Sequence, residues 1–67
     1  MIMKPLKLTK DTLCIGRTQD RRAVWQNGKG PPFISIHDAR QVQHLITVAT
    51  SEIEHIDKPY TRGSLDL

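Results

Sequence analysis

The sequence predicts an α+β fold: a small antiparallel β-meander of three to four strands, followed by one C-terminal amphipathic helix. In the first half of the chain, apolar and polar residues alternate over short stretches that are separated by turn residues. In the second half, apolar residues recur at steps of three and four, as they do on one face of a helix. These residues are Ala39, Val42, Leu45, Ile46, Ala49, Ile53 and Ile56.

Four stretches have the composition of strands. They cover residues 6–9, 12–16, 23–25 and 33–36. The first alternates Leu6 and Leu8 with polar residues and fits either a strand or an extended arm. A polar turn at residues 18–21 follows the second stretch, and Asn27–Gly28, the strongest hairpin signal in the chain, follows the third. Short connections favour antiparallel neighbours, so the helix is expected to pack across one face of the meander.

The helix is expected to begin near His37 or Asp38. Asp38 suits the N-cap, with Gln41 three residues further on, and its carboxylate would lie near the positive end of the helix dipole. Pro59 opposes continuation, so the helix should end by about Asp57. On one face of this helix we expect Ile46, Ala49 and Ile53 to be buried against the sheet.

The single domain is expected to cover residues 1–57, followed by a flexible C-terminal tail at residues 58–67 that lacks periodicity. A chain of 67 residues with one cysteine builds a modest core without an internal disulfide. Self-association is the remaining route to further burial, so we expect a homodimer. Val48 and a stripe of three histidines lie off the main apolar face and are candidate contacts.

Charge is distributed unevenly along the chain. Residues 1–30 carry seven cations and two carboxylates, a net charge of +5, whereas residues 31–67 carry three cations and five carboxylates, a net charge of −2. The two halves together give the overall +3. This asymmetry favours an anionic partner for the basic half, although a solvated surface tuned for solubility explains it as well.

Enzymatic and metal-dependent functions find no support in the sequence. Cys14 lies in an alternating strand without a neighbouring helix N-terminus, and none of the serines lies in a nucleophile elbow. No multi-ligand metal pattern appears, and no apolar run is long enough to span a bilayer. We therefore expect a non-enzymatic protein without cofactor or membrane partner. The lone cysteine and the lack of a signal-peptide pattern predict a cytoplasmic setting.

The basic residues near the expected hairpins are the candidate binding residues. Arginines flank the second hairpin, and a tryptophan follows three residues later, a combination that suits single-stranded nucleic acid because cations neutralise phosphates while the ring stacks on bases. The candidates are Lys7, Arg17, Arg21, Arg22, Trp25 and Lys29. Trp25 stacks only if it points outward. If it points toward the helix instead, it is a core residue.

The expected meander and helix, joined by the segment Lys29–Gly30–Pro31–Pro32–Phe33–Ile34–Ser35–Ile36, resemble the positive-cofactor coactivators that bind single-stranded DNA. The likeness is one of topology over roughly residues 12–56. It implies a dimer with four strands and a helix in each subunit, and a basic concave sheet that binds DNA. It assigns no site residues here.

Two functions remain open at this level. The first is a small nucleic-acid-binding or regulatory accessory protein that contacts phosphates, preferably of single strands, through a basic sheet and hairpin surface. The alternative is a protein–protein interaction module, a small inhibitor or adaptor of the sort that mobile elements encode, whose partner would be a host protein. The second function needs only a compact fold, an apolar patch and a mobile tail.

Overall fold

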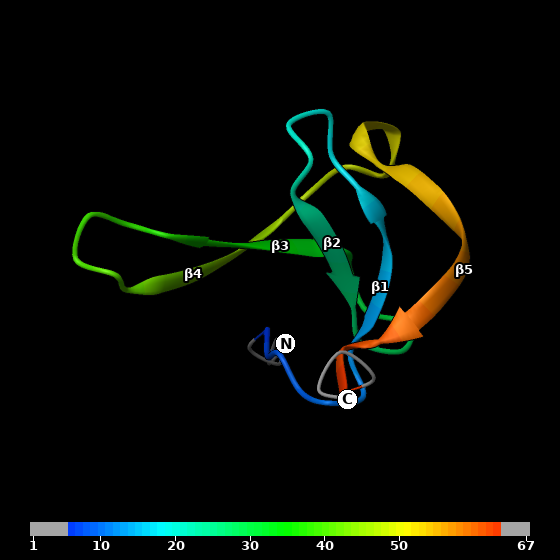
Figure 1. Cartoon of the computed structure of the whole chain (residues 1–67), viewed down its shortest axis with the longest axis horizontal. Coiled ribbons are helices and arrows are strands. Elements are labelled where there is room, and N and C mark those ends of the chain that lie inside the picture. The colour runs from blue at the N-terminus through cyan, green and yellow to red at the C-terminus, as the bar shows by residue number, and fades with distance from the viewer. Residues whose placement is uncertain (1–5, 64–67) are drawn as a thin grey trace, which may run out of the picture.

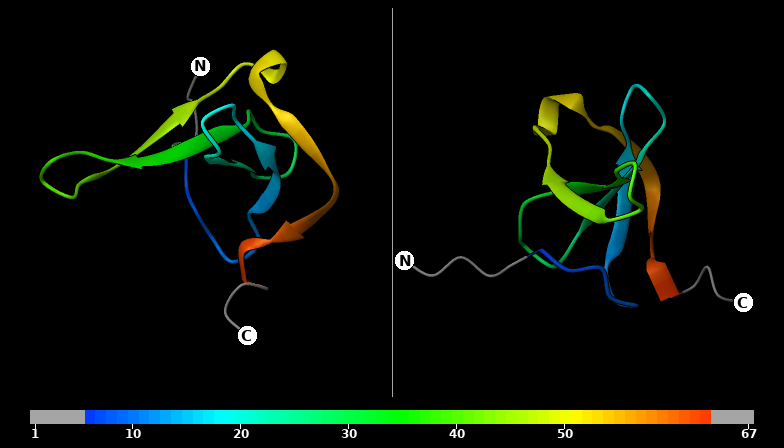
Figure 2. Two further views of the ribbon diagram at one scale, coloured as in Figure 1. Left: turned by 45° about the horizontal axis from the view of Figure 1, so that its top comes forward. Right: turned by 90° about the vertical axis from the view of Figure 1, so that its left-hand side faces the viewer.

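The computed structural model describes residues 6–63, which form one antiparallel sheet of five strands in the order β4-β3-β2-β1-β5 (Figure 1). The elements are β1 (Leu13–Arg17), β2 (Ala23–Gln26), β3 (Phe33–His37), β4 (Gln43–Thr47), the 3₁₀ turn η1 (Thr50–Glu52) and β5 (Glu54–Thr61). The sheet is strongly bent. β1, β2 and β5 form its body, and the β3–β4 hairpin projects away from them (Figure 2).

The first part of the meander is confirmed. The stretches at residues 12–16, 23–25 and 33–36 correspond to β1, β2 and β3, and each strand pairs with the next in antiparallel register. Asn27–Gly28 does begin the loop between β2 and β3: the Gly30 N–H donates to the Asn27 carbonyl over 2.9 Å, and Gly28 has a φ of 53°. Residues 6–9 form no strand.

The predicted α+β fold and its C-terminal helix are wrong. No α-helix occurs in residues 6–63, and the segment assigned to the helix forms β4, η1 and the start of β5. The helical spacing of its apolar residues is also compatible with strands, and β-branched residues are frequent across it, notably Ile46, Thr47 and Val48. Such residues lose rotamer freedom in a helix and pack well on a sheet. Without the helix, the topological likeness to the single-stranded-DNA coactivators has no basis.

The Asp38 carboxylate accepts hydrogen bonds from nearby backbone N–H groups, as an N-cap residue does, but here these bonds stabilise a hairpin loop. Its Oδ1 accepts hydrogen bonds from the N–H groups of Arg40 (2.8 Å) and Val42 (3.0 Å), and its own N–H donates to the Val42 carbonyl. A side chain that bonds to its own neighbouring backbone competes with helix formation. The His44 ring and these N–H groups hold the pKa of the Asp38 carboxyl below its usual value.

The β1–β2 loop is built in the same way around Thr18. The Thr18 N–H donates to the Arg22 carbonyl, the Arg21 N–H donates to the Thr18 carbonyl, and the Arg22 N–H donates to Thr18 Oγ1. In each hairpin loop, the last of the three residues between the closing pair has a left-handed backbone. Its φ is 65° at Arg21 and 64° at Gln41. This three-residue hairpin geometry ordinarily places glycine at the left-handed position.

Replacing Gln41 with glycine is expected to raise the free energy of unfolding by about 0.5–1 kcal/mol. The left-handed conformation costs a side chain about 1–2 kcal/mol, and the extra backbone entropy of glycine offsets part of the gain. Urea unfolding would measure the change. Gln41→Val is the matched opposite, since a β-branched residue tolerates this conformation least. Equal stabilities of the two variants would contradict the loop geometry.

β5 extends the sheet beyond the expected domain boundary. Residues 58–61, which we assigned to the flexible tail, belong to this strand, and Tyr60 lies opposite Cys14 of β1. The N–H of Arg62 then donates to the Thr12 carbonyl over 2.8 Å, and that of Gly63 donates to the Lys10 carbonyl over 2.9 Å. Residues 64–67 of the predicted tail lie outside the described residues.

The core is small and lies where the sheet bends. Its buried apolar residues are Cys14, Val24, Phe33 and Ile53. Of the three residues that we expected to be buried on the helix, only Ile53 is. Ile46 is 44% exposed because it lies on the projecting hairpin, and Ala49, which follows that hairpin, is also exposed. A charged substitution at Ile46 is therefore not expected to disrupt this core.

Candidate functional site

The structure places five of the six candidate residues at the two ends of the β1–β2 pair. Arg17, Arg21 and Arg22 lie at the end that carries the β1–β2 loop. Lys7 and Lys29 lie at the opposite end, where the N-terminal segment approaches the β2–β3 loop. Trp25 lies on β2 between them. The candidates therefore form two separate groups and not one continuous surface.

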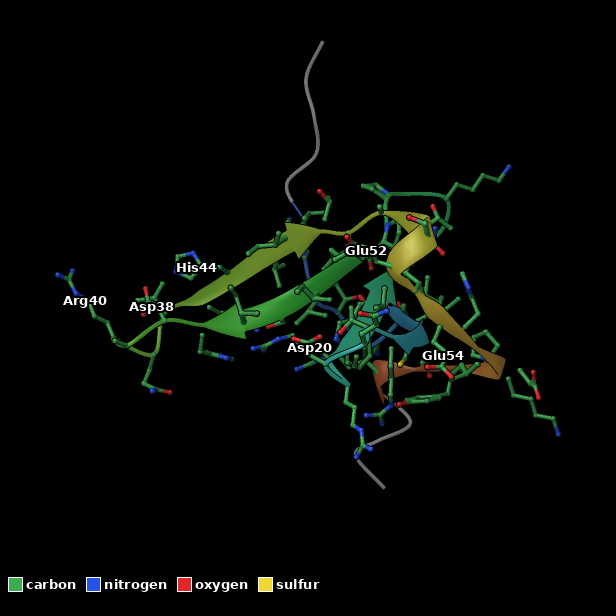
Figure 3. The ribbon with its side chains drawn as sticks, turned by 90° about the horizontal axis from the view of Figure 1, so that it is seen from above. Asp20, Asp38, Arg40, His44, Glu52 and Glu54 are labelled. Atoms are coloured by element: carbon green, nitrogen blue, oxygen red, sulfur yellow. The ribbon has the colours of Figure 1, made fainter. Side chains whose placement is uncertain are left out.

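The arginine end is electrically balanced. Arg22 Nε lies 2.9 Å from Asp20 Oδ2, and Arg17 lies directly opposite Glu54 in the β1–β5 register. Glu52 lines the same hollow as Asp20 (Figure 3). The Thr18 hydroxyl donates to Asp20, and this bond and then Arg22 hold the pKa of the Asp20 carboxyl below its usual value. Three arginines and three carboxylates thus lie at this end, and little net charge is left to attract an anion.

The opposite end of the sheet, which we name the basic end, has the reverse character. It consists of Lys7, Lys10, Lys29 and Arg62, with Asp11 as its carboxylate. Backbone hydrogen bonds from residues 62 and 63 to residues 12 and 10 bring the C-terminal end of β5 beside the N-terminal segment. Four cations against one carboxylate give this end a net charge of +3.

The remaining charges of the described residues cancel locally. Asp38 and Arg40 share the tip of the β3–β4 hairpin, and Asp57 and Lys58 are neighbours in β5. Residues 6–63 contain nine cations and six carboxylates, a net charge of +3. All of this excess is located at the basic end. The location of the excess charge is the principal electrostatic feature of the molecule.

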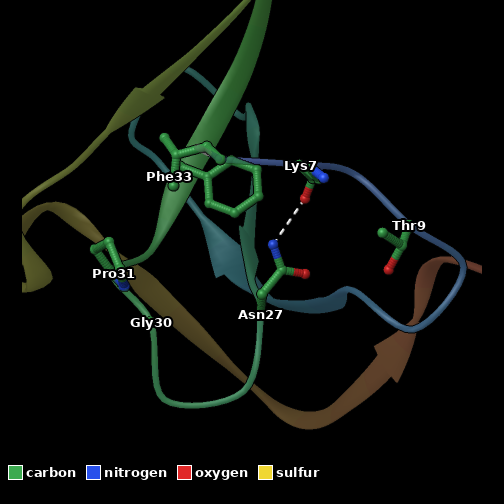
Figure 4. A pocket seen from close by; sticks show the side chains of 7 residues that line it. Lys7, Thr9, Asn27, Gly30, Pro31 and Phe33 are labelled. Carbon is green, nitrogen blue, oxygen red and sulfur yellow. Dashed lines mark hydrogen bonds between the residues drawn. The ribbon is translucent and has the colours of Figure 1, made fainter. Parts of the chain in front are cut away.

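A hollow of about 370 Å³ opens at the basic end (Figure 4). Its walls combine apolar and polar groups: Leu6, Lys7, Thr9, Asn27, Gly30, Pro31 and Phe33. Asn27 holds the site together, since its Nδ2 donates to the Lys7 carbonyl over 2.7 Å and its Oδ1 accepts from the Thr12 hydroxyl over 2.6 Å. Thr12 is fully buried, so this pair of bonds fixes the N-terminal segment against the β2–β3 loop.

Lys10 and Arg62 were missed in the sequence. They are separated by more than fifty positions, and each is an isolated cation in its own segment. Only the pairing of β1 with β5 and the two hydrogen bonds beyond it bring them to one end. No local sequence signal would have identified Arg62, because its position depends entirely on a long-range strand pairing.

Trp25 is half-buried. It is therefore neither fully exposed for stacking nor fully enclosed in the core, the two alternatives that the sequence left open. Its neighbour Val24 is fully buried, and successive side chains of a strand point to opposite faces. Trp25 therefore lies on the face of β2 opposite Val24, with Cys14 and Phe33 across from it in the adjacent strands. Those two neighbours are buried, and Trp25 itself is only partly exposed.

Among residues 6–63, no cluster of three or more histidine, cysteine or acidic side chains could hold a metal ion. Within the same residues, no helix has the length and apolar character needed to cross a membrane. Cys14 is a free and buried thiol, and its Sγ–H donates to the Gly16 carbonyl over 3.7 Å.

Comparisons with protein-family profiles, with curated protein sequences and with solved structures found no match to this chain. Its function must therefore be inferred from its own residues.

Proposed function

We propose that the protein is a small, non-enzymatic accessory protein that binds nucleic acid through its basic end. The observation that carries this proposal is the concentration of the excess positive charge at one end of the sheet. Lysine and arginine side chains that neutralise phosphates release counterions, and this release drives sequence-independent binding. The free thiol of Cys14 suits a reducing, cytoplasmic setting.

The geometry of the basic end favours single strands over duplex. Lys7 lines a hollow that has apolar walls at Leu6 and Pro31, and this hollow offers an unstacked base a place beside a phosphate contact. The partly exposed Trp25 offers further contact area on β2. A duplex keeps its bases stacked inside, so it would use only the charges.

Replacing both Lys7 and Lys29 with glutamine is expected to weaken binding to a single-stranded oligonucleotide. Each lost phosphate contact lowers the slope of log K against log salt concentration by about 0.7 for a single strand. The double variant should therefore show a slope that is shallower by about 1.4, while its circular dichroism spectrum stays unchanged. Fluorescence anisotropy titrations at several salt concentrations would measure the affinity and the slope.

The double variant Arg21→Gln, Arg22→Gln is the matched control, because it removes the same charge from the balanced end. We expect it to retain most of the binding, since Asp20 already pairs with Arg22. If the arginine variant lost more affinity than the lysine variant, the binding site would lie at the β1–β2 loop instead. No binding by the unmodified protein at low salt would refute the proposal.

A protein-interaction function is the second candidate, and a different observation favours it. Val42 and Ile46 are 50% and 44% exposed on the projecting β3–β4 hairpin. Exposed apolar side chains on one element are typical of surfaces that bind another protein. An inhibitor or adaptor acting on a host protein would use this hairpin and would leave the basic end free.

A further inference from the structure

The β3–β4 hairpin presents an apolar face that the sheet leaves uncovered. In its register Ile34 lies opposite Ile46, and Ile36 lies opposite His44. Alternate residues of a strand share a face, so these four side chains lie on one face. Near the body of the sheet, Ile34 meets the β1–β2 loop and η1 around a shared hollow. Toward the tip the hairpin projects alone, and a two-stranded hairpin is only marginally stable in water.

β4 is also an open edge of the sheet, since within residues 6–63 it pairs only with β3. The Val42 carbonyl accepts from Asp38, and the Val48 N–H donates to the Pro32 carbonyl, so the backbones of even-numbered residues face β3. Backbone direction alternates along a strand. The N–H and C=O groups of Gln43, Leu45 and Thr47 therefore point away from β3, toward the open edge.

The two edges of the sheet differ in their protection. β5, at the other edge, contains Asp57, Lys58 and Pro59, and charged residues and proline discourage pairing with another strand. β4 contains no proline, lysine, arginine, aspartate or glutamate. Its sequence Gln-His-Leu-Ile-Thr is a suitable template for an added strand.

We propose that β4 pairs antiparallel with β4 of a second copy of this chain, about a two-fold axis at Ile46. In that register Leu45 of each copy bonds to Thr47 of the other, and the two Ile46 side chains meet at the closer, non-hydrogen-bonded spacing. The pairing joins two five-stranded sheets into one and brings the exposed Ile46 side chains of the two copies into contact at the axis. A two-fold contact of this kind uses the same surface patch of both copies.

Charge complementarity identifies a second copy as the occupant. Arg40 lies six residues before Ile46, in the loop that precedes β4, and Glu52 lies six residues after it, in η1 (Figure 3). Both side chains are exposed. Antiparallel pairing about Ile46 places the hairpin loop that carries Arg40 of each copy at the same end of the paired strands as η1, with Glu52, of the other. One cation and one anion placed symmetrically about the axis match a two-fold partner.

Sedimentation equilibrium over micromolar to millimolar concentrations would test the contact. We expect a monomer–dimer equilibrium, and Ile46→Lys should raise the dissociation constant at least about tenfold, because it places two like charges at the axis. Arg40→Glu and Glu52→Arg should each raise it about threefold, as rim ion pairs do, and the double variant should restore it. Lys58→Glu combined with Glu52→Arg is the control and should restore nothing.

Amide hydrogen exchange gives an independent measurement of the same edge. The N–H groups of Leu45 and Thr47 should exchange slowly in the dimer and rapidly after dilution to the monomer, since only the second copy bonds them. A monomer at every concentration would overturn the proposal. A dimer in which these two amides still exchange rapidly would overturn the assignment to β4. The contact lies away from Lys7 and Lys29, so neither result depends on nucleic-acid binding.

Discussion

Replacing Phe33 with alanine is expected to leave most of the protein unfolded at 25 °C. Phe33 is fully buried and is the largest side chain in the core. Truncation of a buried phenylalanine costs about 3–5 kcal/mol, and the core of so short a chain supplies a similar total, about 3–5 kcal/mol. Circular dichroism and the fluorescence of Trp25 would report the loss of structure.

Val42→Ala is the matched control for Phe33→Ala, because Val42 is 50% exposed on the projecting hairpin. At concentrations where the protein is monomeric, its free energy of unfolding should change by no more than about 0.5 kcal/mol. If Phe33→Ala melted as cooperatively as the unmodified protein and at the same temperature, the placement of Phe33 in the core would be wrong.

Replacing Gly16 with alanine is the second substitution with a large expected effect. Gly16 lies in β1, at the point where the register of the β1–β5 pairing shifts, and His55 of β5 lies opposite it. An added Cβ would overlap the Glu54 carbonyl oxygen and would lie 2.9 Å from both His55 Cα and Ile53 Cγ2. Two of these neighbours are backbone atoms, so β5 must move. We expect a loss of about 3 kcal/mol and a Tm lower by more than about 10 °C.

Gly28→Ala separates this steric effect from the general effect of replacing a glycine. Gly28 has open space around its Cα but a φ of 53°, so alanine there costs only the left-handed backbone, about 1 kcal/mol. Thermal denaturation of both variants would compare them. Equal losses at the two positions would show that β5 does not pack closely on β1.

The sequence by itself determined the local features of the first half of the chain. Alternation identified β1, and composition and turn residues identified β2 and β3. Asn27–Gly28 identified the loop before β3, because turn chemistry depends on residues close in sequence. It also identified Asp38 as a residue whose side chain bonds to neighbouring backbone. Whether that bond caps a helix or closes a hairpin depended on the pairing of β4 with β3.

Only the tertiary structure decided the second half of the chain and the location of the charge. The apolar spacing of residues 39–56 fits a helix or two strands equally, and the choice depends on a partner strand, β3 for β4 and β1 for β5. The same long-range pairing places Arg62 beside Lys10 and opposes Glu54 to Arg17. Alternation and turn residues report neighbours along the chain, whereas the basic end is formed by segments that are distant in it.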